Sequence, residues 1–210
     1  MTFNLVRLLQ DALSRPLPGL DAQLLMAPSP RLGWDPLEFP EGARAGAALV
    51  LVYAHDTSFH IALTVRGSGL RNHTGQVSLP GGGVDEGETI EAAAVREAEE
   101  EIGVARASIQ LLGRLTPLHI PVSGFLLHPV VGYLPERPVF QRAEWEVARI
   151  IEPTLSQLRD PATVKRERRT RVAAGEIVEI DVPFYDIEQE KVWGATAMVL
   201  AEFCAILADR

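Results

Sequence analysis

Residues 82–104 of this chain read Gly-Gly-Val-Asp-Glu-Gly-Glu-Thr-Ile-Glu-Ala-Ala-Ala-Val-Arg-Glu-Ala-Glu-Glu-Glu-Ile-Gly-Val. From Asp85 to Glu101 there are eight acidic residues and one basic residue, Arg96, a local balance of −7. The formal charge of the whole 210-residue protein is −8. Because like charges at this density repel one another and weaken a helix, the sequence predicts a bound divalent cation here.

A helix is predicted between Thr89 and Gly103. Thr89 is a suitable N-cap, and Gly103 is placed to end the helix. At about 100° per residue, one face of this helix is an apolar stripe. The stripe consists of Ile90, Ala94, Ala98 and Ile102.

Three glutamates converge on a neighbouring face of the same helix. Glu97 and Glu101 lie about 40° apart, and Glu100 lies about 60° to the other side of Glu97. The preceding turn, 79–83, is Leu-Pro-Gly-Gly-Gly, whose backbone can approach an ion or phosphate closely. Three carboxylates and a carbonyl, for which Gly82 is the candidate, form an all-oxygen set that suits Mg²⁺ or Mn²⁺ rather than zinc.

The same residues resemble the signature of the Nudix hydrolase family, G-x5-E-x7-R-E-U-x-E-E-x-G-U, where U is aliphatic. The matching positions are Gly82, Glu88, Arg96, Glu97, Glu100, Glu101, Gly103 and Val104. Ala98 stands at a U position, which is a mild departure. The resemblance implies an α/β fold, the Nudix-type α/β/α sandwich with a mixed β-sheet. It also implies that Glu97, Glu100 and Glu101 are catalytic and bind the metal, and that Glu88 and Arg96 orient them.

A second pattern lies immediately upstream and resembles the coenzyme A pyrophosphatase branch of the family. The branch signature is L-L-T-x-R-S/A-x3-R-x3-G-x3-F-P-G-G, and residues 62–82 keep its spacing. Departures occur at Ala62, Gly67 and Leu79. The resemblance implies that the substrate is bound by Arg66, Arg71, Gly75 and Gly81. Weaker matches, such as Trp193-Gly194-Ala195-Thr196-Ala197, extend it over roughly residues 45–204.

The rest of the sequence is typical of one soluble domain. With 47% hydrophobic residues, the chain can fill one α/β core. We expect residues 1–40 to form an N-terminal helix and a proline-rich connection, and residues 41–210 to form the Nudix hydrolase domain. A single cysteine and the lack of a signal peptide or a bilayer-length apolar run favour the cytoplasm, without membrane association. The acidic balance argues against nucleic-acid binding.

Periodicity predicts the remaining elements. Helices are expected over 3–14, 143–151 and 194–207, and strands over 47–53, 60–65, 111–117 and 125–134. Lys165–Arg171, the most basic run, is interpreted as a solvated strand or loop, with contact to a 3′-phosphate as the alternative. Glu144 and Glu146 are expected at the surface, with a role as the base that takes the proton from water as the alternative. Residues 1–40 are a candidate for contact with a second copy in a homodimer, or for an intramolecular cap.

The predicted activity is metal-dependent hydrolysis of the diphosphate bond of coenzyme A or its derivatives, giving 4′-phosphopantetheine and adenosine 3′,5′-bisphosphate. The alternative is hydrolysis of another nucleoside diphosphate derivative. Pro117 and Pro121 keep ADP-ribose open, whereas the absence of an S-Q-P-W-P segment weakens NADH. A non-catalytic nucleotide-binding regulator is the alternative from a different class. It is disfavoured because all three glutamates are present.

Overall fold

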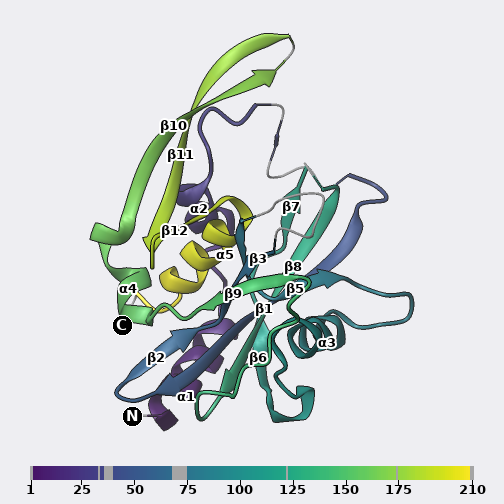
Figure 1. The fold of residues 1–210 in the computed structure, drawn as a ribbon, viewed down its shortest axis with the longest axis vertical. Helices are drawn as coiled ribbons and strands as arrows, with labels where there is room; N and C mark the ends of the chain where they lie inside the picture. The colour runs from purple at the N-terminus through teal and green to yellow at the C-terminus, as the bar shows by residue number, and fades with distance from the viewer. Residues whose placement is uncertain are drawn as a thin grey trace.

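The computed structural model describes residues 2–32, 34–35, 40–67, 75–121, 123–173 and 175–208. Within them, a six-stranded sheet has the order β2–β1–β8–β6, with β5 paired to β1 and β7 paired to β8 (Figure 1). Its strands are β1 (Arg44–His55), β2 (Ser58–Ile61), β5 (Gly81–Gly83), β6 (Gln110–Arg114), β7 (Leu118–Ile120) and β8 (Phe125–Leu134). Strands β1 and β8 run parallel, and the other pairings are antiparallel. The sheet is therefore mixed, which confirms the prediction.

Helices cover both faces of this sheet. The longer ones are α1 (Thr2–Leu13), α3 (Ile90–Ile102) and α5 (Gly194–Ala205). Odd-numbered residues of β1, from Ala47 to Tyr53, pack in one cluster with α3, whereas even-numbered residues, from Ala48 to Val52, pack with α1 and α5. Because both faces of β1 are buried, its sequence is a continuous apolar run. The predicted α/β/α sandwich is confirmed.

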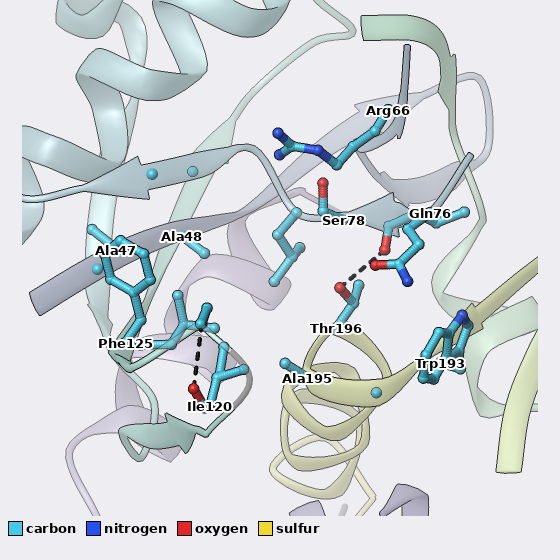
Figure 2. Close-up of a pocket in the computed structure, with 18 of the residues that line it drawn as sticks. Ala47, Ala48, Arg66, Gln76, Ser78, Ile120, Phe125, Trp193, Ala195 and Thr196 are labelled. Carbon is cyan, nitrogen blue, oxygen red and sulfur yellow. Dashed lines mark hydrogen bonds between the residues drawn. The ribbon is translucent and has the colours of Figure 1, made fainter. Parts of the chain in front are cut away.

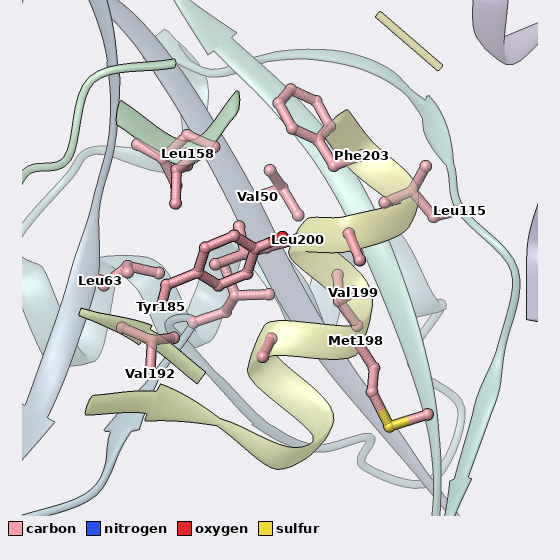
Figure 3. Packing of buried hydrophobic residues seen from close by; sticks show 14 of the residues in the cluster. Val50, Leu63, Leu115, Leu158, Tyr185, Val192, Met198, Val199, Leu200 and Phe203 are labelled. Carbon is pink, nitrogen blue, oxygen red and sulfur yellow. The ribbon is translucent and has the colours of Figure 1, made fainter. Parts of the chain in front are cut away.

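The core on the α5 side also includes strands outside the central sheet. Figure 3 shows Val199, Leu200 and Phe203 of α5 packed near Val50 of β1 and Tyr185. Tyr185 belongs to the β10–β11–β12 sheet, formed by β10 (Val164–Ala173), β11 (Glu176–Ile187) and β12 (Glu190–Trp193). The far end of the β10–β11 hairpin extends away from the body of the molecule (Figure 1).

A third small sheet lies next to the acidic helix α3. It has the order β4–β3–β9, formed by β3 (Leu63–Arg66), β4 (Val77–Ser78) and β9 (Val147–Ile151). The remaining helical segments are short. They are the α-helices α2 (Gly19–Gln23) and α4 (Leu155–Arg159), and the 3₁₀ turns Leu24–Met26, Arg106–Ser108 and Pro161–Thr163.

Most of the predicted elements are present with small shifts of boundary. The helices expected over 3–14 and 194–207 correspond to α1 and α5, and the strands over 47–53, 111–117 and 125–134 correspond to β1, β6 and β8. The strand expected over 60–65 is divided into β2 and β3 at Ala62. The solvated strand proposed for Lys165–Arg171 is part of β10, and the other strands of its sheet, β11 and β12, were not predicted.

The helix predicted over 143–151 is wrong. Residues 144–146 form a turn, and the chain continues as β9. Val147 and Ile151 are both buried, a four-residue spacing that also fits one face of a helix. Their strand conformation comes from antiparallel pairing with β3, which places Val147 opposite Arg66 and Ile151 opposite Leu63. This partner is distant in sequence, so local periodicity cannot reveal it.

The N-terminal segment packs on the same core. Leu9 of α1 is fully buried, and α2 is anchored to α5 by the buried carboxylate of Glu202. This carboxylate accepts hydrogen bonds from the Gly19 N–H at 3.2 Å, Gln23 Nε2 at 2.8 Å and Thr116 Oγ1 at 2.6 Å. These contacts agree with the intramolecular cap, one of the two alternatives for residues 1–40. The division at residue 40 stays a prediction, and within the described part of the chain no helix has the length and apolarity to cross a bilayer.

Candidate active site

Helix α3 is fixed at both ends and along its buried face. The Thr89 side chain accepts a hydrogen bond from the Ala92 N–H at 3.2 Å, which confirms the N-cap. Gly103 ends the helix with φ +71°, and a β-carbon there would lie 2.6 Å from Cβ of Gln141. Glycine is therefore required both by the left-handed backbone and by the close approach. Ala98 and Ile102 are fully buried, so the glutamates beside them have defined positions.

The Arg96 guanidinium is the centre of an ion-pair network. Its Nε and Nη2 atoms each donate to a different Glu88 oxygen at 3.0 Å, and Nη2 also donates to the Gly83 carbonyl at 2.9 Å. Its Nη1 donates to Glu97 at 2.8 Å and to Glu100 at 3.3 Å. The hydrogen bonds from Arg96 lower the pKa of Glu88. This network joins the turn to the helix, as expected if Glu88 and Arg96 orient the acidic residues.

Glu97 lies directly against the glycine turn. A β-carbon added at Gly82 would be 2.4 Å from Glu97 Oε1, so only glycine leaves room for the carboxylate in this position. Burial raises the pKa of Glu97, and the hydrogen bond from Arg96 opposes that rise. Charge on Glu100 and Glu146 adds to the rise. The protein thus holds an ionisable group in a site that disfavours its negative charge.

Glu101 is the most buried of the predicted metal ligands. It is 3% exposed, and within the described residues its Oε2 atom has no hydrogen-bond partner. Burial raises its pKa to about 8, and the charges of Glu146 and Glu97 contribute to the rise. Arg66 and a hydrogen bond from the Gly81 N–H act in the opposite direction. Such a carboxylate is stable as an anion only beside a further positive charge.

Glu146, which was expected at the surface with a role as the base as the alternative, lies beside the site. Its carboxylate lies 3.9 Å from Arg66 Nη2, and its side chain is only 28% exposed. The pairing of β3 with β9 places it there, because the Gly67 N–H donates to the Glu146 carbonyl at 2.8 Å. A non-local β-pairing leaves no short-range signal in the sequence. Glu144, by contrast, is exposed as expected and pairs with Arg142 at 3.4 Å.

The predicted metal ligands are neighbours, but they do not share one ready-made cluster. Across the described ranges, no three His, Cys, Asp or Glu side chains stand at the spacing of a metal site. Arg96 draws Glu97 and Glu100 to its Nη1 atom, and Glu100 is 53% exposed. The residues still fit a hard divalent cation. Glu101 has a buried oxygen without a partner among the described residues, and Glu97 packs on Gly82. The atoms available to coordinate a cation, carboxylate and carbonyl oxygens, are those that such a cation prefers.

A cavity of about 480 Å³ opens beside this turn (Figure 2). Arg66, Gly81 and Gly82 line it, so the upstream pattern and the glycine turn beside the acidic helix share its wall. The predicted metal ligands Glu97, Glu100 and Glu101 are not among the lining residues. Such a volume is within the roughly 300–1,000 Å³ that is usual for small-molecule sites. Much of its wall is apolar, with Phe125 and Leu127 from β8 and Ala195 from α5. Arg171 and Trp193 also line it, although they are far from the turn in sequence.

Gly75, a further predicted substrate-binding residue, is not among the residues that line the cavity. Gly75 lies in the connection between β3 and β4, where its N–H donates to the Arg66 carbonyl at 3.1 Å. Its φ of +74° requires glycine, so it supports the strand end that carries Arg66. Arg71 lies outside the described residues.

Known proteins match the part of the chain that contains the glycine turn and helix α3. The family description "NUDIX domain" matches residues 43–172, more than half of the chain. The chain is 34% identical to an uncharacterized Nudix hydrolase, NudL, of Pectobacterium atrosepticum, over 80% of this chain and 84% of that protein. It is 35% identical to NudL of an Escherichia coli O6:H1 strain, over 68% of this chain and 72% of that protein.

Among solved structures, the fold is similar to that of a MutT/nudix family protein from Enterococcus faecalis. The TM-score is 0.50 at 17% identity, with 84% of this chain and 66% of that chain covered. This likeness concerns the fold alone. Together with the domain match and the NudL identities, the glycine turn and the Arg96-centred glutamates of α3 show that the chain belongs to the Nudix hydrolase family.

Proposed function

We propose that this Nudix hydrolase cleaves the diphosphate bond of coenzyme A or its derivatives, with Mg²⁺ or Mn²⁺, to 4′-phosphopantetheine and adenosine 3′,5′-bisphosphate. One observation carries the proposal. A single cavity is lined by Arg66, from the pattern at 62–82, and by Gly81 and Gly82, from the turn that abuts the acidic helix. The wall thus combines Arg66, from the pattern that resembles the coenzyme A branch, with Gly82, the signature glycine that packs against Glu97.

Glu97, Glu100, Glu101 and the Gly82 carbonyl would hold the cation. A diphosphate carries negative charge, and it would be repelled by this segment of α3 without a cation between them. When bound, the cation supplies charge stabilisation to the phosphoryl oxygens and lowers the pKa of water. Burial raises the pKa of the Glu101 carboxyl to about 8, and this supports the proposal because a cation beside the carboxyl would favour its ionised form.

The remaining residues bind and orient. Arg66 faces the cavity, and its guanidinium can grip a phosphate through two hydrogen bonds. Glu146, at 3.9 Å from Nη2, restrains its position. Arg71 and Gly75 are proposed to assist from the connection between β3 and β4. Arg96 and Glu88 fix the direction of Glu97, and Glu97 and Glu100 are our first candidates to accept the proton from the attacking water.

Product analysis tests this proposal. Wild-type protein and the Glu100→Gln variant are incubated with coenzyme A, ADP-ribose and NADH, with EDTA or with added Mg²⁺ or Mn²⁺. We expect cation-dependent release of adenosine 3′,5′-bisphosphate by the wild type and none by the variant, with unchanged circular dichroism. Cleavage of ADP-ribose or NADH but not of coenzyme A would show a Nudix hydrolase with another substrate and would contradict the assignment of coenzyme A. Binding of these nucleotides without cleavage would indicate a regulator.

A further inference from the structure

Arg171 differs from the other basic residues of strand β10. Four of them are each paired with an acidic side chain: Lys165 with Asp186, Arg166 with Asp181, Arg168 with Glu179 and Arg169 with Glu167. Within the described residues, Arg171 has no ion pair, and it lines the cavity that also contains Arg66. Besides Arg66, which pairs with Glu146, the cavity therefore has a second cationic side chain, and among the described residues its charge is unpaired.

Trp193 provides an aromatic surface in the same wall. One face of its ring is covered by the Arg169 guanidinium, whose central carbon is 4.2 Å from the ring centroid. Arg169 is held in turn by Glu167, which also binds Lys191. Residues 167, 169 and 171 alternate along β10 and so share one face of the strand. Arg169 thus holds the Trp193 indole in place, and Arg171 lies on the same side of the hairpin as Arg169.

Trp193 lies at the opposite side of the cavity from the apolar end. Figure 2 shows Trp193 at one side and Phe125 at the other. Thr196, at the start of α5, lies between them in this view, and its hydroxyl donates to the Val77 carbonyl at 3.1 Å. That hydroxyl is thus engaged within the protein, and charge recognition at this side depends on arginine.

We infer that Trp193 and Arg171 form a subsite for the nucleoside end of the substrate, where the indole stacks on the base and Arg171 binds a second phosphate on the ribose. The inference rests on the proposed function, because Arg66 is assigned to the diphosphate. Aromatic rings stack on any nucleobase, whereas guanidinium adds a directional contact to phosphate. Two arginines in one cavity suit a nucleotide with phosphate groups at two positions, as in coenzyme A with its 3′-phosphate.

The test compares coenzyme A with 3′-dephospho-coenzyme A, which differ only in the phosphate assigned to Arg171. Arg171→Gln is expected to lower kcat/KM for coenzyme A about tenfold to hundredfold, mainly through KM, as loss of a charged hydrogen bond predicts. The value for the dephospho substrate is expected to change less than about threefold, which is under 1 kcal/mol. Trp193→Leu is expected to lower both values together. Arg168→Gln removes the same charge from β10 at a position outside the cavity wall, and it should leave both unchanged.

A binding experiment separates failure of the subsite from failure of the proposed function. Calorimetry in EDTA measures adenosine 3′,5′-bisphosphate and adenosine 5′-monophosphate against the wild type, Arg171→Gln and Arg168→Gln. Tighter binding of the bisphosphate by the wild type, lost in Arg171→Gln alone, supports the subsite even if another diphosphate is the substrate. Equal affinity for both nucleotides, or an equal loss of both substrates in Arg171→Gln, overturns it. Absence of turnover with either coenzyme A form overturns the proposed function instead.

Discussion

The carboxylate of Glu97 occupies the space in which a side chain of residue 82 would lie. An added β-carbon at Gly82 would be 2.4 Å from Glu97 Oε1 and 2.6 Å from its carboxyl carbon. This contact joins strand β5 to helix α3 and sets how near the carboxylate can come to the Gly82 backbone. Replacing the three consecutive glycines of β5 one at a time therefore separates catalytic from structural roles.

Gly82→Ala is expected to lower kcat/KM about a hundredfold while the protein stays folded. The added methyl group meets only the end of a flexible side chain, which can rotate away, and a displacement of about 1 Å at a catalytic group can cost that much. Gly83→Ala is the matched control, because its nearest neighbour would be Phe125 Cε1 at 4.0 Å. Steady-state kinetics of the two variants decides, and equal activities would contradict the role given to this contact.

Gly81→Ala is expected to lower stability rather than activity alone. Its β-carbon would lie 2.3 Å from the Ala47 carbonyl oxygen and 2.7 Å from Ala48 Cα, both backbone atoms of β1. Strands β5 and β1 must separate to accept it, at a cost of about 1–3 kcal/mol. Urea denaturation measures the difference. A midpoint equal to that of Gly82→Ala would show that the turn is less constrained than the structure indicates.

Arg96→Lys is expected to lower kcat/KM about tenfold to hundredfold through misplacement of Glu97. Lysine keeps the charge, but its ammonium cannot bond both Glu88 oxygens, Glu97 and the Gly83 carbonyl at once. Arg106→Lys serves as the control, because Arg106 pairs with the exposed Glu99 elsewhere on α3. If Arg96→Lys matched the wild type in kcat/KM, charge alone would suffice and the fork of hydrogen bonds would have no catalytic role.

Glu101→Gln should alter how stability depends on pH in the cation-free protein. The pKa of Glu101 is raised to about 8, whereas in the unfolded chain a glutamate has a pKa of about 4.3. Between these values the native state retains a proton that the unfolded state releases, so stability falls as pH rises. The glutamine variant lacks this fall and should gain at least about 1 kcal/mol on the wild type between pH 5 and pH 9. The free energy of unfolding of both proteins is measured in EDTA across this pH range. If the difference between them did not change with pH, the raised pKa would be disproved.

The pair Arg137–Glu152 should contribute stability in the opposite pH range. Burial raises the pKa of Glu152, but hydrogen bonds from Arg137 and Tyr53 outweigh this and lower it. The contribution is present above pH about 4.3 and is lost as pH falls through the lowered value. Arg137→Gln should cost about 1 kcal/mol at pH 7, a modest value because Arg137 is 38% exposed. Denaturation at pH 7 and pH 3 should show that difference shrink, and a constant difference would contradict the pairing.

The fold could be predicted where the sequence carries local signals. Thr89, Gly103 and the apolar stripe of α3 define that helix without reference to the rest of the chain. The continuous run of β1 indicates a strand buried on both faces. Strand β9 could not be predicted, because its conformation depends on pairing with β3, and the charged sequence of β10 lacks the alternation of a half-buried strand. Tertiary contacts decide such segments.

The candidate site also contains residues that local sequence signals could place and residues that depend on tertiary contacts. Glu97, Glu101 and Gly82 could be placed from helical spacing and from the glycine turn, and the structure brings them together. Arg66 could be nominated by resemblance, but its neighbour Glu146 comes from a strand pairing. Arg171 and Trp193 lie on strands β10 and β12, and only the completed fold brings them into the cavity with Arg66. The sequence therefore indicates the acidic end of the site better than the end that we assign to the nucleoside.

The most direct measurement is a competition assay in one tube. Equal concentrations of coenzyme A, ADP-ribose and NADH are incubated with the wild-type protein and Mn²⁺, and the loss of each is followed by chromatography with mass detection. The relative rates give the ratios of kcat/KM. We predict that coenzyme A disappears at least about tenfold faster than the others, a difference of about 1.4 kcal/mol, with adenosine 3′,5′-bisphosphate formed in equal amount. Consumption of ADP-ribose or NADH at the same or a greater rate would contradict the assignment of coenzyme A as substrate.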